Sequence, residues 1–592
     1  MNDPTPPPPP PPPPYSERTP LFSDRSSRPP SYRCRWDDAG HASYNECLEQ
    51  SSQPEKNRNI NNILKKALGS VALAFALVFG VIWGFYGVAI WWDGGGGKSV
   101  KGVDVVRVGV VGAGPAGINA AYALSKHKFP SSKEKNDIDL HITIYEQNSH
   151  VGGRLIPSLP KSDLKHELHA EDFATGGLAR NSILASAAWD SLGLVYGVTG
   201  RGDERTMRTG FYNGRGVVSE LPRPRSELGF GRWAALLWRY GLSVSYGGNV
   251  PTGTMKAWDA MLERAAKGRK GYESVWDILG GKMAGALGLG AMTRLQRNNI
   301  GDGYRDEVVR PQVRRQAGMG LEDISDLALS MALEREYKGT CVEGQEGNFE
   351  KVMKGFAESS KAELKLERKV TGLKRELFNE TREMWVVQAI GSEGLEYEMF
   401  DHIVLAAPFN ATLFPDAKLD MEDVLYTPAH LTFVSTKSAP KLSIGSGLDQ
   451  ILLIDPKTNI GTDTAKTKEI NEITYIRDVF SLSTSSLVES RYLYRITASS
   501  PLSTGDVHAL FGEENVDAVQ QQSIENAWPV TMPRDGGDRG EFEIGKGRGL
   551  WGMGSGEGWV SSVDWMWVLG GVVGGKLGEA VEVGRERADQ EG

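Results

Sequence analysis

The chain has 592 residues, a formal net charge of −8 and three cysteines. Its acidic balance and the lack of a basic stripe exclude a nucleic-acid-binding protein. Cys34 and Cys47 fall in the N-terminal tail and leave Cys341 alone, so the folded part cannot be built on a disulfide framework. We interpret Cys341 as a small buried hydrophobic residue rather than as a catalytic thiol.

The composition of residues 1–66 predicts a disordered, proline-rich tail. Pro6 to Pro14 is an unbroken proline run, which can only form polyproline II and suits a spacer or a ligand for a proline-binding module. From Tyr15 to Asn62 aliphatic residues are few, so the buried apolar surface would be too small to offset the entropy of ordering.

Residues 67–92 predict a transmembrane helix. Leu68 to Trp92 carries no charge and exceeds the roughly 20 apolar residues that a bilayer requires. Trp91 and Trp92 stand at its far end, where interfacial aromatic residues are enriched. The segment begins too far along the chain for a signal peptide, so we interpret it as a retained anchor.

The charges that flank this span predict its orientation. Four basic residues precede it, whereas acids and bases are balanced in the Gly-rich linker that follows at 93–104. Positive residues remain in the cytosol, so we expect a single-pass type II protein whose large C-terminal part is lumenal, in a vacuole, lysosome or other endomembrane compartment. The glycosylation sequons at Asn379 and Asn410 agree with a lumenal domain.

The central prediction is a dinucleotide-binding turn. Residues 105–111 form a β-branched run of strand length, and residues 118–126 have helical spacing of apolar residues. A G-x-G-x-x-G string joins them and consists of Gly112, Ala113, Gly114, Pro115, Ala116 and Gly117. At a strand-to-helix turn its glycines permit the tight turn, the approach of a pyrophosphate and close helix packing. The helix N-terminus adds N–H donors for the phosphates.

A second strand and a second motif follow. Residues 140–145 read as a strand that ends on Glu146, where a ribose hydroxyl requires an acceptor. A polar insertion at 130–137 explains the unusually long distance between the glycines and this acid. Gly152, Gly153 and Arg154 come several residues after Glu146, and this pattern of a glutamate followed by G-G-R resembles the second signature of the flavin amine oxidase superfamily. That resemblance implies that the two motifs hold FAD.

The rest of the chain resembles the prenylcysteine oxidases, also called prenylcysteine lyases. The resemblance covers roughly residues 105–580 and rests on blocks at 308–324, 342–349, 400–410 and 554–564. Two departures stand out: Arg315-Gln316-Ala317-Gly318 replaces the family's N-Y-G-Q string, and Asp564 replaces a glutamate. They bear on substrate identity more than on FAD binding, because the glycines and Glu146 are intact.

The resemblance implies a specific reaction. Prenylcysteine oxidases cleave the thioether of prenylcysteine, left by breakdown of prenylated proteins, to cysteine and a prenyl aldehyde, with molecular oxygen as acceptor and hydrogen peroxide as product. The difficult chemistry belongs to the cofactor, so no acid–base pair is demanded and we assign no catalytic residue. The sequence shows no metal-ligand cluster.

A Gly-rich turn at 552–558 predicts a further part of the cofactor site. It leads into an apolar helix that we expect to begin at Trp559, so free backbone N–H groups and Glu557 would lie near the cofactor.

The predicted fold class is α/β. A Rossmann-like FAD-binding domain, made of residues 105–200, 340–410 and 545–590, is interleaved with a substrate-binding domain made of 200–340 and 410–545. Helical patterns dominate from about 207 to 335, which suits a cap over the substrate. Two alternatives remain at this stage: a flavin amine or polyamine oxidase, and a non-catalytic, membrane-tethered binding protein with the same fold.

Overall fold

The computed structural model describes most of the chain from residue 104 onward. The chain divides into the units Met1–Ser99 and Val100–Gly592, and the described residues all belong to the second. They are 104–129, 138–155, 168, 182–193, 207–223, 228–268, 271–338, 348–378, 382–408, 424–438, 447–454, 470–482, 488–534, 539–544, 547–553, 556–560 and 562–591. The predicted tail, transmembrane helix, linker up to residue 103 and sequons lie outside the described residues, as does Cys341. None of the described helices combines the length and apolar composition needed to cross a membrane.

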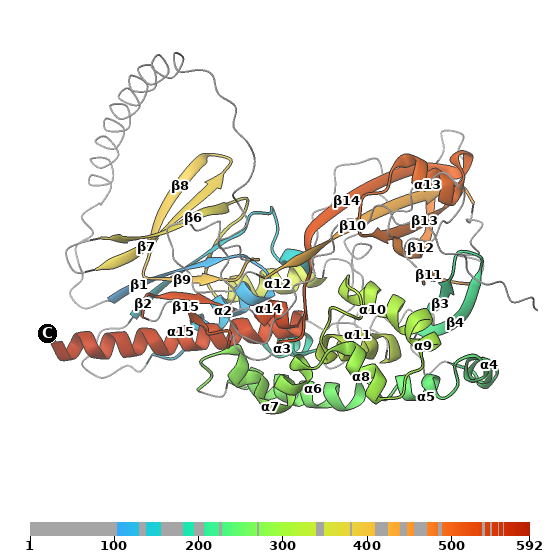
Figure 1. Ribbon diagram of the computed structural model, residues 1–592. Coiled ribbons are helices and arrows are strands. Elements are labelled where there is room, and N and C mark those ends of the chain that lie inside the picture. Colours follow the sequence, from blue (N-terminus) through green and yellow to red (C-terminus); the bar gives the residue numbers. More distant parts are fainter. Residues whose placement is uncertain are drawn as a thin grey trace, which may run out of the picture. The chain divides into compact units, whose positions relative to one another are not determined.

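A six-stranded sheet contains the predicted dinucleotide-binding strands (Figure 1). Its strands are β1 (Asp104–Val111), β2 (Ile138–Tyr145), β5 (Glu363–Lys365), β9 (His402–Leu405), β15 (Glu543–Ile544) and β16 (Leu550–Gly552). Their order is β15-β16-β9-β1-β2-β5, and every pair is parallel except β15 with β16. Strands of a parallel sheet are buried on both faces and read as apolar runs. The strands predicted at 105–111 and 140–145 are confirmed for that reason.

Helices cover this sheet. They are α2 (Pro115–Ser125), α3 (Ile183–Leu192), α12 (Asn348–Ser359), α14 (Gly556–Trp559) and α15 (Val563–Glu591), with a 3-10 turn, η1 (Gly153–Leu155). The helix expected to begin at Trp559 is corrected by the structure: Trp559 ends the short α14, and the long helix begins at Val563. Trp559 is fully buried, so its apolar character reflects core packing rather than membership of that helix.

A glycine stripe lets α15 lie directly against α2 (Figure 1). A Cβ atom on Gly570 would overlap the carbonyl oxygen of Ala116, and one on Gly574 would overlap that of Ala120. Asn119 Nδ2 donates across the same contact to the carbonyl oxygen of Trp567 at 2.6 Å. The C-terminal helix therefore completes the packing of the helix that follows the glycine turn.

A small antiparallel sheet inserts between β5 and β9. It consists of β6 (Lys369–Leu377), β7 (Glu383–Gly391) and β8 (Gly394–Phe400), in that order. Trp385 and Phe400 pack with Ile403 and Leu405 of β9 in one buried cluster. This sheet belongs to the chain region predicted as part of the FAD-binding domain.

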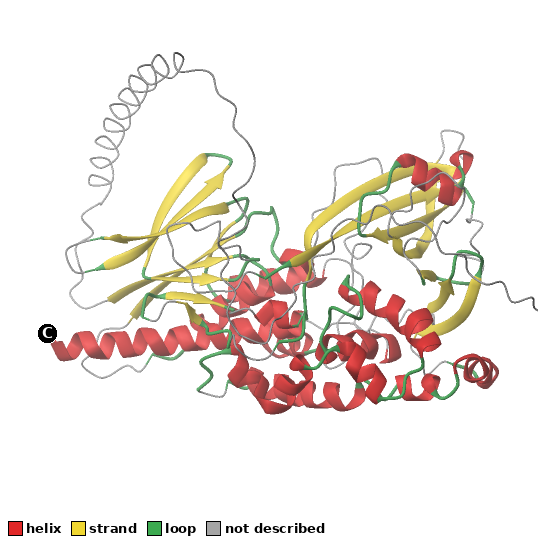
Figure 2. Ribbon diagram, viewed as in Figure 1, coloured by secondary structure: helices red, strands yellow, loops and turns green. Residues whose placement is uncertain are grey.

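A seven-stranded sheet forms the second layer of strands (Figure 2). Its strands are β3 (Met207–Tyr212), β4 (Val217–Arg223), β10 (Tyr426–Thr436), β11 (Gln450–Leu453), β12 (Ile470–Leu482), β13 (Val488–Ala498) and β14 (Val516–Pro529). Their order is β14-β10-β13-β12-β11-β3-β4. Helix α13 (Thr504–Phe511) and the 3-10 turn η7 (Glu513–Asn515) precede β14. The region from residue 207 is expected to be mostly helical, but it begins with a hairpin of β3 and β4. The segment is a strand because β3 also pairs with the distant β11.

The helical region itself is confirmed from residue 230 onward. It comprises α4 (Phe230–Tyr240), α5 (Ser243–Gly247), α6 (Thr252–Ala266), α7 (Val275–Gly288), α8 (Ala291–Arg297), α9 (Asp302–Tyr304), the π-helical turn η5 (Arg305–Val309), α10 (Arg310–Ala317) and α11 (Asp326–Lys338). Leu295, Val313 and Leu329 from three of these helices share one core with Phe211 of β3 and Leu221 of β4. The hairpin and the helices therefore form one packed unit.

A buried ion pair joins α10 to α11. Arg315 and Glu336 are 3% and 4% exposed, and their guanidinium and carboxylate are hydrogen-bonded. Gln316 Nε2 donates to the other carboxylate oxygen of Glu336 at 2.8 Å, and Arg315 also donates to Gln450 of β11. The carboxylate of Glu336 thus joins α10 to α11 and, through Arg315, both helices to strand β11 inside the seven-stranded sheet.

His402 at the start of β9 predicts a loss of stability in acid. Burial lowers the pKa of His402 to about 4, and the nearby Arg382 lowers it further while Asp401 opposes the shift. An unfolded histidine titrates near 6.5, so the unfolded state alone gains the proton as the pH falls from about 6.5 to 4. We expect about 3 kcal/mol of stability to be lost across this window.

The replacement His402→Leu tests this expectation. Melting temperatures of the wild type and the variant, measured from pH 7 to pH 4, should converge as the pH falls, because only the wild type has the depressed histidine. Parallel curves would show that His402 does not titrate with a lowered pKa.

Candidate functional site

The glycine turn has the geometry that the motif predicts. Gly112 follows β1 with φ of +104°, in the region that favours glycine, and its N–H donates to the carbonyl oxygen of Tyr145 at 2.8 Å. A Cβ atom here would lie 3.0 Å from the backbone of Ala406, just beyond β9. The first glycine is therefore required both by backbone conformation and by the neighbouring strand.

The other two glycines differ in a way that fits a bound pyrophosphate. A Cβ atom on Gly117 would overlap the carbonyl oxygen of Gly112, so this position holds α2 against the turn. A Cβ atom on Gly114 would meet nothing within 4 Å. Gly114 caps the N-terminus of α2, with Pro115 in the first turn and Ala116 buried behind it. An open cradle at a helix N-terminus, with free N–H donors, suits phosphate groups.

The second motif packs on the first. Gly152 N–H donates to the carbonyl oxygen of Ala113 at 2.8 Å, and a Cβ atom on Gly153 would lie 3.3 Å from Cα of Gly114. Gly153 has φ of +56°, which also favours glycine. The structure thus brings together all six residues of the turn and both glycines of the second motif.

Glu146 lies at the end of β2, directly below the turn, and is 5% exposed. One carboxylate oxygen, Oε2, accepts from the N–H of Ala113 at 2.9 Å, and Oε1 accepts from Asn148 N at 3.0 Å and Nδ2 at 2.8 Å. A carboxylate offers about four acceptor positions, so one remains on Oε2. Glu146 would therefore both hold the turn and accept a hydrogen bond from a ribose hydroxyl.

Glu146→Ala should lower the flavin content of the purified protein. The variant loses the ribose acceptor and leaves the Ala113 N–H without its partner, at a cost of about 1 to 3 kcal/mol. The ratio of visible to ultraviolet absorbance measures flavin content. Asn148→Ala is the matched control, because it removes the side-chain donor Nδ2 to Glu146 and keeps both the backbone N–H donor and the ribose acceptor. Full occupancy in Glu146→Ala would remove the ribose assignment.

Arg154 and Glu557, distant in sequence, form an ion pair with Tyr426 beside them. Arg154 Nη2 contacts Glu557 Oε1, the Tyr426 hydroxyl donates to Glu557 Oε2 at 2.7 Å, and the guanidinium lies 5.5 Å from the Tyr426 ring centre. Arg154 Nη1 also donates to the carbonyl oxygen of Asn526 at 3.0 Å. Burial raises the pKa of Tyr426 to about 12, so its hydroxyl stays a donor.

This cluster links the cofactor motifs to the seven-stranded sheet. Burial lowers the pKa of Arg154, but a guanidinium stays charged at any physiological pH. Protein surrounds Arg154, but its side chain keeps 35% of its surface accessible. Arg154 can therefore still contact a ligand. Tyr426 was not predicted from the sequence, because a tyrosine at a strand start has no local signal.

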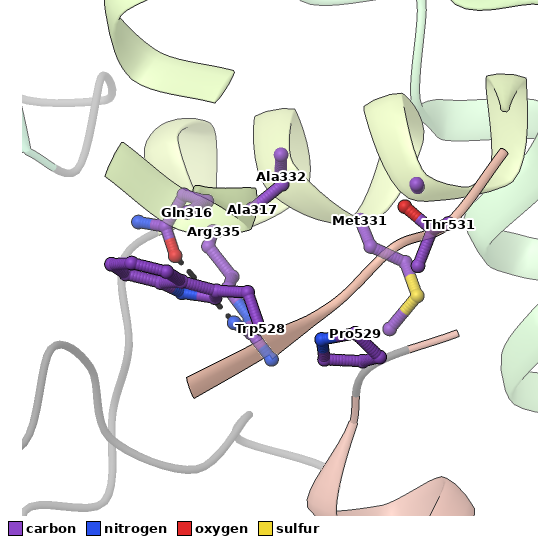
Figure 3. A pocket seen from close by; sticks show the side chains of 9 residues that line it. Gln316, Ala317, Met331, Ala332, Arg335, Trp528, Pro529 and Thr531 are labelled. Atoms are coloured by element: carbon purple, nitrogen blue, oxygen red, sulfur yellow. Dashed lines mark hydrogen bonds between the residues drawn. The ribbon is translucent and has the colours of Figure 1, made fainter. Parts of the chain in front are cut away.

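A pocket lies where α10 and α11 meet the end of β14 (Figure 3). Its walls are mostly apolar, and its lining residues are Gln316, Ala317, Ala328, Met331, Ala332, Arg335, Trp528, Pro529 and Thr531. Pro529 pairs with Tyr426 across β14 and β10. The pocket is therefore one strand away from the ion pair of Arg154 and Glu557.

Arg335 supplies the positive charge of this pocket. It donates to Gln316 Oε1 at 3.5 Å, as Figure 3 shows, and forms no ion pair among the described residues. Burial lowers its pKa, while the charges of Asp564 and Glu336 oppose that shift. The pocket thus offers an apolar wall and one cation to a ligand.

Asp564 has a structural role that the sequence did not reveal. Its Oδ1 accepts from Ser182 Oγ at 2.6 Å and from Leu184 N at 3.0 Å, so it anchors the start of α3 to the start of α15. Burial raises the pKa of Asp564, opposed by these hydrogen bonds and by Arg335. The aspartate that replaces the expected glutamate is therefore fully engaged in this fold.

Together, the parallel sheet, the open glycine cradle and Glu146 define a dinucleotide-binding oxidoreductase fold. Residues 110–177 match the family of NAD(P)-binding Rossmann-like domains, and residues 226–544, more than half of the chain, match the prenylcysteine lyase family. The chain belongs to the prenylcysteine lyase family. The predicted family is confirmed, and with it an FAD-dependent oxidase and FAD as the cofactor.

Solved structures with a similar arrangement include amine oxidases. A triple mutant of putrescine oxidase has 14% identity and a TM-score of 0.44, covering 82% of this chain and 100% of that one. Cyclohexylamine oxidase from Brevibacterium oxydans has 13% identity and a TM-score of 0.42, covering 81% and 99%. An oxidoreductase from Methanosarcina mazei has 12% identity and a TM-score of 0.43, covering 78% and 99%. No curated protein sequence matches this chain.

Proposed function

We propose that this protein cleaves the thioether of prenylcysteine, consuming one oxygen and one water and yielding free cysteine, a prenyl aldehyde and hydrogen peroxide. In the balanced reaction the carbon next to sulfur is oxidised to the aldehyde, the carbon–sulfur bond breaks, and the sulfur keeps a proton as a thiol. When bound, FAD supplies the acceptor for the hydride and the route of the electrons to oxygen. The observation that carries the proposal is the prenylcysteine lyase match over the residues that build the pocket.

The residues of this chain would position FAD and the substrate. Gly112, Gly114 and Gly117 would hold the pyrophosphate, and Glu146 the ribose. Arg154 and Glu557 would fix the second motif against the substrate side, where Tyr426 joins the pocket strands. The alanine, methionine, tryptophan and proline walls of the pocket would form one apolar end of the substrate site and keep bulk water away, and they would have to move apart to admit a prenyl chain.

The pocket favours a thioether over an amine. The residues described in its lining include no carboxylate and no lysine, and its charged group is the cation Arg335. A simple amine or polyamine carries only positive charge and would be repelled by that guanidinium, whereas the α-carboxylate of prenylcysteine would pair with it. An amine or polyamine oxidase activity is therefore the weaker alternative.

Visible absorption of the purified full chain tests the function. The spectrum is recorded without oxygen before and after the addition of farnesylcysteine. Bleaching of a flavin band, followed by peroxide release when oxygen returns, is the expected result. A flavin band that bleaches with putrescine but not with farnesylcysteine would favour the amine oxidase, and the absence of any flavin would favour a non-catalytic binding protein.

The membrane topology is part of the same proposal. The uncharged segment at 67–92 and the basic residues before it support a type II anchor, a cytosolic proline-rich tail and a catalytic domain in the lumen of a vacuole or lysosome. The tail would recruit a proline-binding module, and Asn379 and Asn410 would carry glycans. Protease digestion of sealed vesicles should spare residues 105–592; their digestion would overturn this topology.

A further inference from the structure

Helix α4 presents large apolar side chains to solvent. Phe230 is 81% exposed, Trp238 is 93% exposed, and Leu242, just after the helix, is 58% exposed. Figure 1 shows α4 at the edge of the helical region, next to α5. A contiguous group of exposed aromatic and aliphatic residues in an otherwise well-packed unit indicates a surface that binds something.

The outward apolar face of α4 differs from the face that anchors the helix. At about 100° per residue, Phe230, Ala235 and Trp238 share one side of α4. Leu236, which is buried, lies on the opposite side with the partly buried Trp233 and packs into the core of the helical region. The ring of Phe230 stacks on that of Trp233 with the ring centres 6.2 Å apart, yet Phe230 remains 81% exposed. Trp238, at 93% exposed, is in excess of what the fold needs.

A cationic stripe borders this outward face. Arg232 and Arg239 stand seven residues apart on the same side of α4, both are exposed, and α4 contains no acidic residue. Arg239 Nη2 binds Glu307 at 2.8 Å, while Arg232 Nη2 is 4.0 Å from Glu220. A guanidinium has five N–H donors, so both side chains keep donors for an anionic group.

The size and chemistry of the surface favour a lipid bilayer over a protein. The helix has 11 residues and is only about 16 Å long. Its exposed large apolar side chains are Phe230 and Trp238, with Leu242 just after it, far fewer than the roughly 20 to 30 residues that each partner contributes to a stable protein interface. Tryptophan, phenylalanine and leucine beside arginine are typical of helices that lie in the bilayer–water interface. Arg239 binds Glu307 through both Nε and Nη2, and Arg232 faces Glu220, so the donors that remain on the two guanidinium groups are what would contact lipid phosphates.

We propose that α4 lies on an anionic membrane surface, with Phe230, Trp238 and Leu242 inserted among the lipid headgroups and acyl chains. Arg232 and Arg239 then contact the lipid phosphates at the level of the interface. This contact fixes the orientation of the folded unit on the bilayer, which a single point of attachment to the membrane would leave undetermined. The inference does not depend on the reaction proposed above.

Depth measurement by a nitroxide label tests the proposal in the full chain. Cys34, Cys47 and Cys341 are replaced by serine, and Ala235→Cys introduces one label on the outward face while Phe230 and Trp238 stay intact. The chain is reconstituted into vesicles of phosphatidylcholine and phosphatidylserine. Collisions with oxygen and with a water-soluble nickel complex are compared. We expect the label to lie about 5 to 10 Å below the headgroup surface.

A label at Lys256→Cys, an exposed position of α6, is the matched control and should be accessible to nickel. If the label at position 235 is equally accessible to nickel, the proposal is overturned. A label protected from both oxygen and nickel would also overturn it, because a protein partner would then cover the helix. None of these outcomes depends on flavin or on turnover, so they are distinguishable from a failure of the proposed function.

Discussion

Gly114→Ala should leave the fold intact and strip the protein of most of its FAD. A Cβ atom at Gly114 meets nothing within 4 Å, and the residue has an extended backbone with φ of −76°, so alanine is compatible with the folded chain. The same methyl group would occupy the cradle in which the pyrophosphate has to approach the backbone. We expect flavin occupancy to fall by about tenfold or more, equal to at least about 1.4 kcal/mol of binding.

The matched control for this variant is Gly117→Ala in the same turn. Its methyl group would overlap the carbonyl oxygen of Gly112, so the packing of α2 on β1 should suffer and the melting temperature should fall. Flavin absorbance and thermal unfolding are measured for both variants. If Gly114→Ala keeps wild-type flavin occupancy, the cradle is not the pyrophosphate site.

Glu336→Ala should destabilise the protein by about 3 to 5 kcal/mol, because it leaves the buried charge of Arg315 without its partner. Gln316 also loses its acceptor. Urea unfolding of the purified full chain, followed by tryptophan fluorescence, measures the change in the free energy of unfolding.

Two further variants make this result specific. The double replacement Arg315→Met with Glu336→Leu removes both charges and should recover most of the lost stability, as buried pairs often do when both members become apolar. Glu263→Ala breaks an exposed pair with Lys267 and should cost about 0.5 kcal/mol or less. A Glu336→Ala variant as stable as Glu263→Ala would contradict the assigned importance of the pair.

The parts of this fold with a strong local pattern could be predicted from the sequence. β1, the glycine turn and Glu146 were recognisable because a buried parallel strand, a strained turn and a helix start each restrict the residue types within a few positions. The helices from 252 to 317 were recognisable from their periodicity. The sequence predicts that Arg154 and Glu557 each lie at the cofactor site. It does not predict that the two side chains form an ion pair.

The remainder depends on contacts between distant segments. The sequence of β3 alone suggests part of a helical region. Its strand conformation depends on pairing with β11, more than 230 residues later. Tyr426, Trp528 and Arg335 form the link and the pocket only because β10, β14 and α11 meet in three dimensions. No spacing rule within one segment could identify them.

The glycine contact between α2 and α15 has a consequence for synthesis. Asn119 and Trp567, which join across it, are 448 residues apart. At about 5 to 20 residues per second, the ribosome needs roughly 20 to 90 seconds to make the second helix after the first. During that time the side of α2 that packs on α15 has no partner, although α12 can already cover another part of the helix. A premature stop codon that removes only the last 30 residues or so should therefore abolish cofactor binding, although every residue of both nucleotide-binding motifs would already have been made.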